Sequence, residues 1–90
     1  MDHHLVLDPN WGILAEDDGL PNPRMVRKVR QGSGMVVARV IATTRDLNSM
    51  MANPHVLTAE IYRHSGWERV GEFASADLAL RAIVERRRKD

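Results

Sequence analysis

One run of nine residues, 35–43, constrains the fold more than any other part of this 90-residue chain. Its sequence, MVVARVIAT, is rich in β-branched residues and predicts a strand. Because side chains alternate between the two faces of a strand, one face would carry Val36, Ala38, Val40 and Ala42. The opposite face is also largely apolar, with Arg39 as its charged side chain. A strand that is apolar on nearly both faces is typical of the centre of a sheet.

Two later segments predict further strands. Residues 55–63 would place three apolar side chains on one face: Leu57, Ala59 and Ile61. Residues 67–73 alternate less regularly, and Gly71 within them predicts a bulge. Between these two strands, residues 64–66 (His-Ser-Gly) predict a tight turn whose glycine supplies a positive φ. A short turn is also expected over residues 46–51, before the second strand.

The C-terminal segment has the pattern of an amphipathic helix. Ser75 can cap its first turn, and Asp77 lies where the helix dipole favours an acid. The apolar stripe consists of Ala76, Ala79, Leu80 and Ile83. Residues 86–89 place four cations in the last turn. These elements predict an α+β fold over residues 35–90, in which a three-stranded antiparallel sheet is packed by a C-terminal helix.

Residues 1–34 are interpreted as an N-terminal arm that contains a short basic helix. Asn22 can cap this helix, and Pro23 suits its first position. On a helix over residues 23–31, one side would be apolar, with Met25, Val26 and Val29. The other side would carry four cations: Arg24, Arg27, Lys28 and Arg30. A strand is the alternative for this segment, because valine favours extended backbone.

Composition excludes several classes of protein. Thirteen Lys and Arg residues balance twelve Asp and Glu residues to a formal net charge of +1, so the chain is neither a histone-like polycation nor an acidic tail. Without cysteine it can form no disulfide and no thiolate zinc site. No apolar run approaches the length of a membrane span, and the first twenty residues lack the pattern of a signal peptide. A cytoplasmic protein without membrane contact is therefore expected.

Charge is strongly segregated along the chain. Residues 1–20 contain five acidic and no basic side chains, whereas residues 21–45 contain six basic and no acidic ones. Such blocks either neutralise each other within a fold or mark an interaction segment. In the first case Glu16, Asp17 and Asp18 would pair with the basic segment, and in the second the basic segment would meet a partner.

Residues with catalytic or metal-binding chemistry are sparse. Ser65 adjoins His64, but a nucleophile also needs a spatially placed base and a third orienting group. Glu68 and Glu72 would share a strand face, which is more typical of a solvated edge than of a carboxylate pair in catalysis. The His3-His4 dipeptide lacks further ligands at metal-binding spacing. The sequence predicts no enzyme, no metal site and no cofactor.

The segment 36–88 resembles two families of DNA-binding domains, the plant ethylene-responsive-factor domains and the phage integrase arm-binding domains. The similar motifs are Ala59-Glu60-Ile61, Gly71-Glu72-Phe73 and the capped SADLALRA run at residues 75–82. In these families a three-stranded sheet enters the DNA major groove, so the resemblance implies DNA contacts by Arg39, Arg63, Trp67 and Arg69. The chain departs from them by placing carboxylates in the same strands, namely Glu60, Glu68 and Glu72. Carboxylates on a groove-facing sheet would repel phosphate.

The hypothesis favoured by these observations is a small non-enzymatic adaptor or regulatory protein that binds another protein with an acidic surface. Its contact residues would be Arg24, Arg27, Lys28, Arg30 and Tyr62. Weak, non-specific binding of nucleic acid is also expected from the basic segment. Two alternatives stay open: a DNA-binding domain that uses its three-stranded sheet, and a structural subunit of a homo-oligomeric or phage-like assembly.

Overall fold

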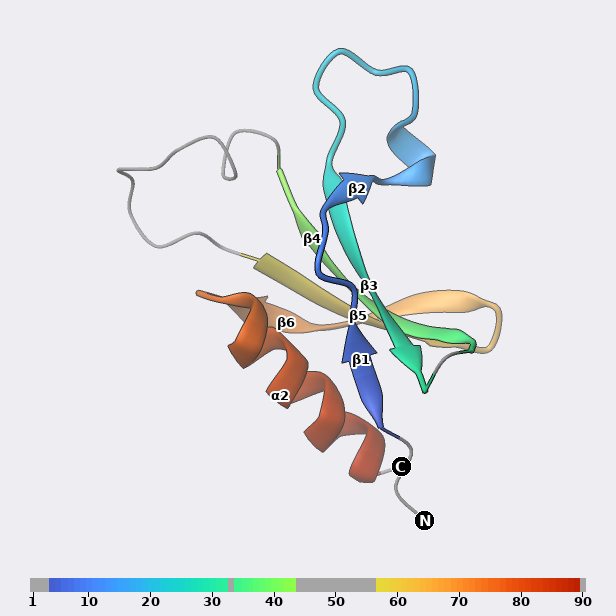
Figure 1. Ribbon diagram of the computed structural model, residues 1–90, viewed down its shortest axis with the longest axis vertical. Coiled ribbons are helices and arrows are strands. Elements are labelled where there is room, and N and C mark those ends of the chain that lie inside the picture. Colours follow the sequence, from blue (N-terminus) through green and yellow to red (C-terminus); the bar gives the residue numbers. More distant parts are fainter. Residues whose placement is uncertain (1–3, 33, 44–56, 90) are drawn as a thin grey trace.

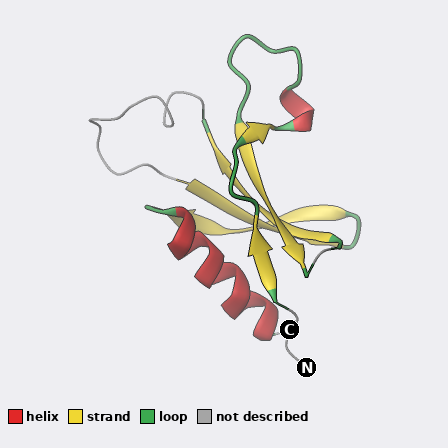
Figure 2. Cartoon of the chain, in the orientation of Figure 1, coloured by secondary structure: helices red, strands yellow, loops and turns green. Residues whose placement is uncertain are grey.

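The computed structural model describes residues 4–32, 34–43 and 57–89. Within them the chain forms one antiparallel sheet and one long helix that packs across a face of that sheet (Figures 1 and 2). The elements in chain order are β1 (Leu5–Leu7), β2 (Gly12–Ile13), the 3-10 helix η1 (Ala15–Asp17), β3 (Met25–Gln31), β4 (Val36–Ala42), β5 (Leu57–Arg63), β6 (Gly66–Phe73) and α2 (Ala76–Arg88). The α+β class is therefore confirmed.

The strand order in the sheet is β1-β3-β4-β5-β6, and β2 also pairs with β3. The predicted central strand is confirmed, because β4 pairs with β3 on one side and β5 on the other. The three predicted strands are present as β4, β5 and β6. The described residues nevertheless form a sheet of six strands, not three, because the segment before residue 34 adds β1, β2 and β3.

The prediction of a helix over residues 23–31 is wrong, because Met25–Gln31 forms strand β3. Val26 and Val29 are three residues apart, a spacing that also fits one side of a helix. In the strand they face opposite ways, and each is buried in a different apolar cluster. Gly32, with φ of +60°, then lets the chain reverse into β4. The predicted boundary at residue 34 thus falls in the turn between two paired strands.

The main core lies between the sheet and α2. Its buried members are Val29, Val37, Ala38, Val40, Ala42, Leu57, Ala59, Ile61, Ala79 and Ile83. The predicted faces of β4, β5 and the helix are therefore largely confirmed. Val37 is an exception, since the register shifts between Val29 and Arg30, and Val37 joins the helix-side core at this irregularity. The cap is also confirmed, because the Ser75 hydroxyl accepts a hydrogen bond from the Leu78 amide.

The face opposite α2, here called the open face, is covered only in part. The segment that contains β2 and η1 crosses one end of it, on the other side of the sheet from α2 (Figure 1). There Leu14 packs against Val26 and Ile41 in a second, smaller apolar cluster. Leu14 is 2% exposed in this cluster, whereas Ile13 stays 53% exposed. The N-terminal segment therefore belongs to the same fold as the sheet.

The connection between β5 and β6 differs from the predicted turn. Positive φ angles occur at His64 (50°) and Ser65 (66°), not at Gly66, which pairs with Arg63. Two consecutive residues with positive φ are typical of the two-residue turn that matches strand twist. The predicted bulge in the last strand is confirmed, since the register shifts opposite Ala59 and Glu60, next to Gly71.

The turn predicted over residues 46–51 lies outside the described residues. No helix in the described part of the chain is long and apolar enough to cross a membrane.

The core between α2 and the sheet makes a first prediction. Ile83 is fully buried in this core, so Ile83→Ala is expected to lower the free energy of unfolding by about 2–5 kcal/mol. Arg81→Ala, at an exposed position on the same helix, is the control and should change it by less than about 0.5 kcal/mol. Urea denaturation followed by circular dichroism measures both. Equal losses in the two variants would contradict the assigned helix face.

Candidate functional site

The open face carries a row of charged side chains across four strands. Register places Lys28 beside Arg39, Arg39 beside Glu60, and Glu60 beside Arg69. Side chains at directly opposed positions share a face and lie close enough to interact. Three cations therefore share this row with one carboxylate. Which of these charges is available to a partner depends on the ion pairs that each side chain makes within the fold.

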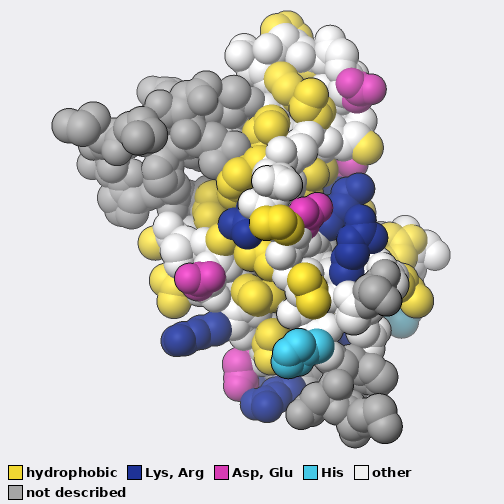
Figure 3. All heavy atoms as spheres, in the orientation of Figure 1, with side chains coloured by type: hydrophobic (Ala, Val, Ile, Leu, Met, Phe, Trp, Pro, Cys, Tyr) yellow, Lys and Arg dark blue, Asp and Glu magenta, His cyan; other side chains and the backbone are white. Residues whose placement is uncertain are grey.

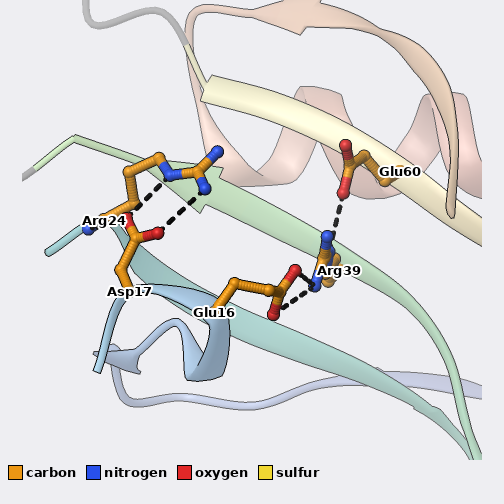
Figure 4. Close-up of polar contacts among 5 residues, drawn as sticks. All are labelled: Glu16, Asp17, Arg24, Arg39 and Glu60. Atoms are coloured by element: carbon orange, nitrogen blue, oxygen red, sulfur yellow. Dashed lines mark hydrogen bonds and ion pairs between the residues drawn. The ribbon is translucent and has the colours of Figure 1, made fainter. Parts of the chain in front are cut away.

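Arg39 is the most buried charge in this row, with 8% of its surface exposed. Its Nε donates to Oε1 of Glu60 at 2.6 Å, and its Nη1 lies 3.1 Å from Oε2 of Glu16 in η1 (Figure 4). The guanidinium carbon also lies 3.9 Å from the centre of the Trp67 ring. A buried guanidinium is tolerated only when it is paired and hydrogen-bonded. These contacts join β4 to η1, β5 and β6.

The aromatic pair of Tyr62 and Trp67 continues this network. The two residues are opposed in the β5–β6 register, with ring centres 5.0 Å apart at an interplanar angle of 63°. This edge-to-face geometry is favourable for aromatic rings. Trp67 is half-buried against Arg39, whereas Tyr62 is 45% exposed. The pair thus presents an aromatic surface to solvent at the margin of the Arg39 network.

A second ion pair closes the loop that follows η1. Asp17 is 7% exposed and accepts hydrogen bonds from the Arg24 amide at 2.9 Å and from Nε and Nη2 of Arg24 at 2.8 and 2.9 Å (Figure 4). The side-chain and then the backbone hydrogen bonds from Arg24 lower the pKa of Asp17 from 3.8 to about 2, although burial opposes them. The same side-chain bond raises the pKa of Arg24. This pair holds η1 against the start of β3.

A cavity of about 310 Å³ lies between the N-terminal segment and the open face. Its walls are mostly apolar and come from β2, η1, β3, β4 and β6, with three charged side chains among them. The lining residues are Ile13, Leu14, Ala15, Glu16, Val26, Lys28, Val36, Arg39 and Trp67. An apolar concavity with a few polar groups is the usual form of a binding site.

The five predicted partner-binding residues separate into two groups. Arg24 is held by Asp17, and Arg27 donates from Nε to the Asp8 carbonyl at 2.6 Å and lies 5.7 Å from the Trp11 ring centre. Strand alternation places Lys28 and Arg30 on the open face, as it does Tyr62. The four cations therefore do not share one face, because residues 25–31 form a strand. The structure brings Lys28, Arg30 and Tyr62 together on the open face.

The four residues implied by the DNA-binding resemblance are also dispersed. Arg39 is buried and paired, and Trp67 stacks on it. Arg63 lies on the helix side of the sheet, 3.6 Å from Glu68, which also pairs with Arg86 of α2. Arg69 alone stands on the open face with much of its side chain exposed, and it pairs with Glu72 at 2.8 Å. These four side chains therefore do not form one continuous basic surface on the described strands.

Sequence reasoning missed the cavity wall formed by Ile13 and Glu16. Ile13 and Glu16 lie in a short segment whose sequence does not indicate which strand it contacts. The alternative in which acidic residues screen the basic segment is confirmed for Asp17, which pairs with Arg24. It is also confirmed for Glu16, which pairs with Arg39 of the same basic block, in the central strand. Among residues 4–32, 34–43 and 57–89, no group of three or more His, Cys, Asp or Glu side chains could hold a metal ion.

Comparisons with known proteins add no family. No model of a protein family matches the chain, and searches of curated proteins and of solved structures found no significant match. The resemblance to sheet-plus-helix DNA-binding domains therefore stays a prediction.

The Arg39 network makes a second prediction. Glu60→Gln replaces a largely buried carboxylate that accepts the short bond from Arg39, and should lower the free energy of unfolding by about 1.5–3 kcal/mol. Glu72→Gln is the matched control, because its partner Arg69 and Glu72 itself are more than half exposed, and its effect should stay below about 1 kcal/mol. Urea denaturation at neutral pH compares them. A larger loss of unfolding free energy in Glu72→Gln than in Glu60→Gln would contradict the stabilising role assigned to the Arg39–Glu60 pair.

The low pKa of Asp17 makes a third prediction, on stability against pH. A carboxyl group whose pKa is lower in the folded chain stabilises the fold above its unfolded value of 3.8, and this contribution is lost as pH falls toward 2. Asp17→Asn removes the titrating group, so the difference in stability between the original chain and this variant should shrink as pH falls from 4 to 2. Thermal unfolding at a series of pH values measures this difference, with Asp18→Asn, at an exposed neighbouring position, as the control.

Proposed function

We propose that this chain is a non-enzymatic adaptor or regulatory module that binds another protein through the open face of its sheet. The observation that carries the proposal is the gathering of exposed apolar side chains around the cavity. Ile13 lines the cavity at 53% exposure, and Tyr62 is 45% exposed beside Trp67, another residue of the cavity lining. Contiguous exposed apolar side chains are typical of protein interaction sites.

The two faces of the sheet support this assignment of the docking surface. On one face the apolar side chains of the sheet are buried against α2. On the other face the small Leu14 cluster covers only one end of the sheet, and the aromatic pair and the cavity remain accessible. A tyrosine with an exposed ring beside a cavity is the kind of residue that contributes strongly to protein interfaces.

The two alternative functions receive less support. A sheet that docks in a DNA groove needs cations directed at phosphate, but Arg39 is paired with two carboxylates and Arg63 lies on the side of α2. A subunit of an assembly would also use an exposed apolar surface. The experiment below distinguishes this case, because self-assembly would crosslink the chain to itself.

A photo-crosslinking experiment tests the proposed function. Benzoylphenylalanine is introduced at position 62 or, as a matched control, at position 78 on α2, since Tyr62 and Leu78 are 45% and 46% exposed. In cells that naturally produce the chain, irradiation should give a discrete heterologous adduct from position 62 but not from position 78. The partner identified by mass spectrometry is then purified, and its binding is measured by calorimetry with the original chain.

The direct binding measurement decides the outcome. Ile13→Asp places a charge in the proposed interface at an exposed position and should weaken binding by at least about tenfold. Leu78→Asp, with similar exposure on the helix, should leave the dissociation constant unchanged. Equal crosslinking from both positions, or a dissociation constant insensitive to Ile13→Asp, would contradict docking on the open face.

A further inference from the structure

The size of the cavity limits what can fill it. Its volume of about 310 Å³ lies at the lower end of the range of about 300–1,000 Å³ found for small-molecule sites. Such a space suits one large side chain better than a complete drug-sized ligand. Its apolar walls include Leu14, Val26 and Val36, and the half-buried ring of Trp67 adds an aromatic surface. An apolar or aromatic side chain matches this lining.

The charges around the cavity determine which residues of a partner are favoured on either side of the side chain that enters it. Arg39 is matched by Glu60 and Glu16, so its charge is already satisfied within the fold. Lys28 also lines the cavity and is exposed, and no ion pair of this lysine is found among the described residues. Lys and Arg side chains cluster beside β3 on the surface of the molecule (Figure 3). At the opening next to β3, Lys28 is thus a cation without an ion pair among the described residues.

Arg30 extends this positive charge along the same strand. It lies two residues after Lys28 and so on the same face of β3. Its Nη1 lies 3.4 Å from the Gly34 carbonyl, and no carboxylate partner of Arg30 is found within residues 4–32, 34–43 and 57–89. Glu16, on the opposite wall, is half exposed and would repel an acid placed deep in the cavity. Carboxylates are therefore favoured at the β3 rim and disfavoured inside.

From these observations we infer the partner's chemistry, resting on the proposed function: the open face binds an acidic segment with one apolar anchor. The anchor, an aromatic residue or a leucine, enters the cavity against Trp67. Carboxylates on either side of the anchor meet Lys28 and Arg30 at the rim. Rim charges of this kind mainly set specificity and association rate, whereas the buried anchor supplies most of the affinity.

The test uses synthetic peptides as defined probes, with Trp67 as the reporter. The chain has two tryptophans, so Trp11→Phe leaves Trp67 as the sole tryptophan fluorophore in the sequence. The probes are capped pentapeptides: Glu-Glu-Phe-Glu-Glu, its alanine-centred analogue, and versions with Gln or Lys in place of Glu. Trp67 emission is titrated with each at low ionic strength, after circular dichroism has established that the Trp11→Phe chain is folded.

The expected result is saturable binding of the acidic phenylalanine peptide and a clear order among the others. The alanine-centred peptide should bind at least about fivefold more weakly, because the anchor no longer fills the cavity. The Gln version should be intermediate, and the Lys version should not bind. Addition of salt should weaken binding of the acidic peptide, because screening reduces its attraction to Lys28 and Arg30.

Charge reversal on the protein separates the rim from non-specific attraction. Lys28→Glu should weaken binding of the acidic peptide by at least about fivefold and reduce the preference over the Lys version. Arg81→Glu changes the net charge equally at an exposed position on α2 and should alter binding less than about twofold. Backbone amide shifts in NMR spectra establish that both variants keep the fold.

Specific outcomes would overturn the inference. It fails if none of the peptides binds, if the acidic and basic peptides bind equally, or if Lys28→Glu and Arg81→Glu weaken binding to the same extent. Any of these results combined with a heterologous adduct from position 62 would leave the proposed function standing and reject only this partner chemistry. Loss of the position-62 adduct would instead reject the docking surface itself.

Discussion

The burial of one charged side chain organises this fold. Arg39 stands in the central strand, where the rest of the sequence pattern is apolar, and is 8% exposed. A guanidinium removed from water needs matched carboxylates, so the chain brings Glu60 from β5 and Glu16 from η1 to it and stacks Trp67 of β6 on its plane. Because these partners come from separate elements, the satisfaction of this one charge positions the N-terminal segment, the last strand and the cavity between them.

The same interaction explains why the two faces of the sheet differ. On the helix side, small and branched residues allow α2 to pack closely, and the core there needs no polar contact. On the open face, Arg39 holds η1 above the sheet by its contact with Glu16, and Asp17 holds the following loop through Arg24. Leu14 fills only part of the space beneath this segment. The segment is thus held by its pairing with β3 at Gly12–Ile13 and by ion pairs at Glu16 and Asp17, and the cavity lies where Leu14 does not fill the space beneath it.

Local patterns predicted those parts of the fold that have local causes. The alternation in residues 35–43 indicated the central strand, and Ser75 with its apolar stripe indicated α2. The pattern failed for residues 25–31, because Val26 and Val29 are buried against different partners on opposite faces, and their spacing imitates one helical side. Lys28 and Arg30 were grouped in the sequence on one side of a helix, and they share a face of the fold because they are two residues apart in strand β3. The wall of the cavity was not predictable, because the contact between Glu16 and Arg39 joins residues 23 positions apart.

These ion pairs explain part of the separation of acidic and basic residues along the chain. Glu16 and Asp17 of the acidic segment form ion pairs with Arg39 and Arg24, so part of the acidic and basic charge is neutralised within the fold. Since Arg39 already has two carboxylates, a further acid from a partner would gain little there. Lys28 and Arg30 are cations of this face for which no carboxylate partner is found within the described part of the chain. We therefore infer that β3 determines the selectivity of the open face. The sequence pattern of this segment predicted a helix, but the extended strand places Lys28 and Arg30 on one face and Arg27 on the other.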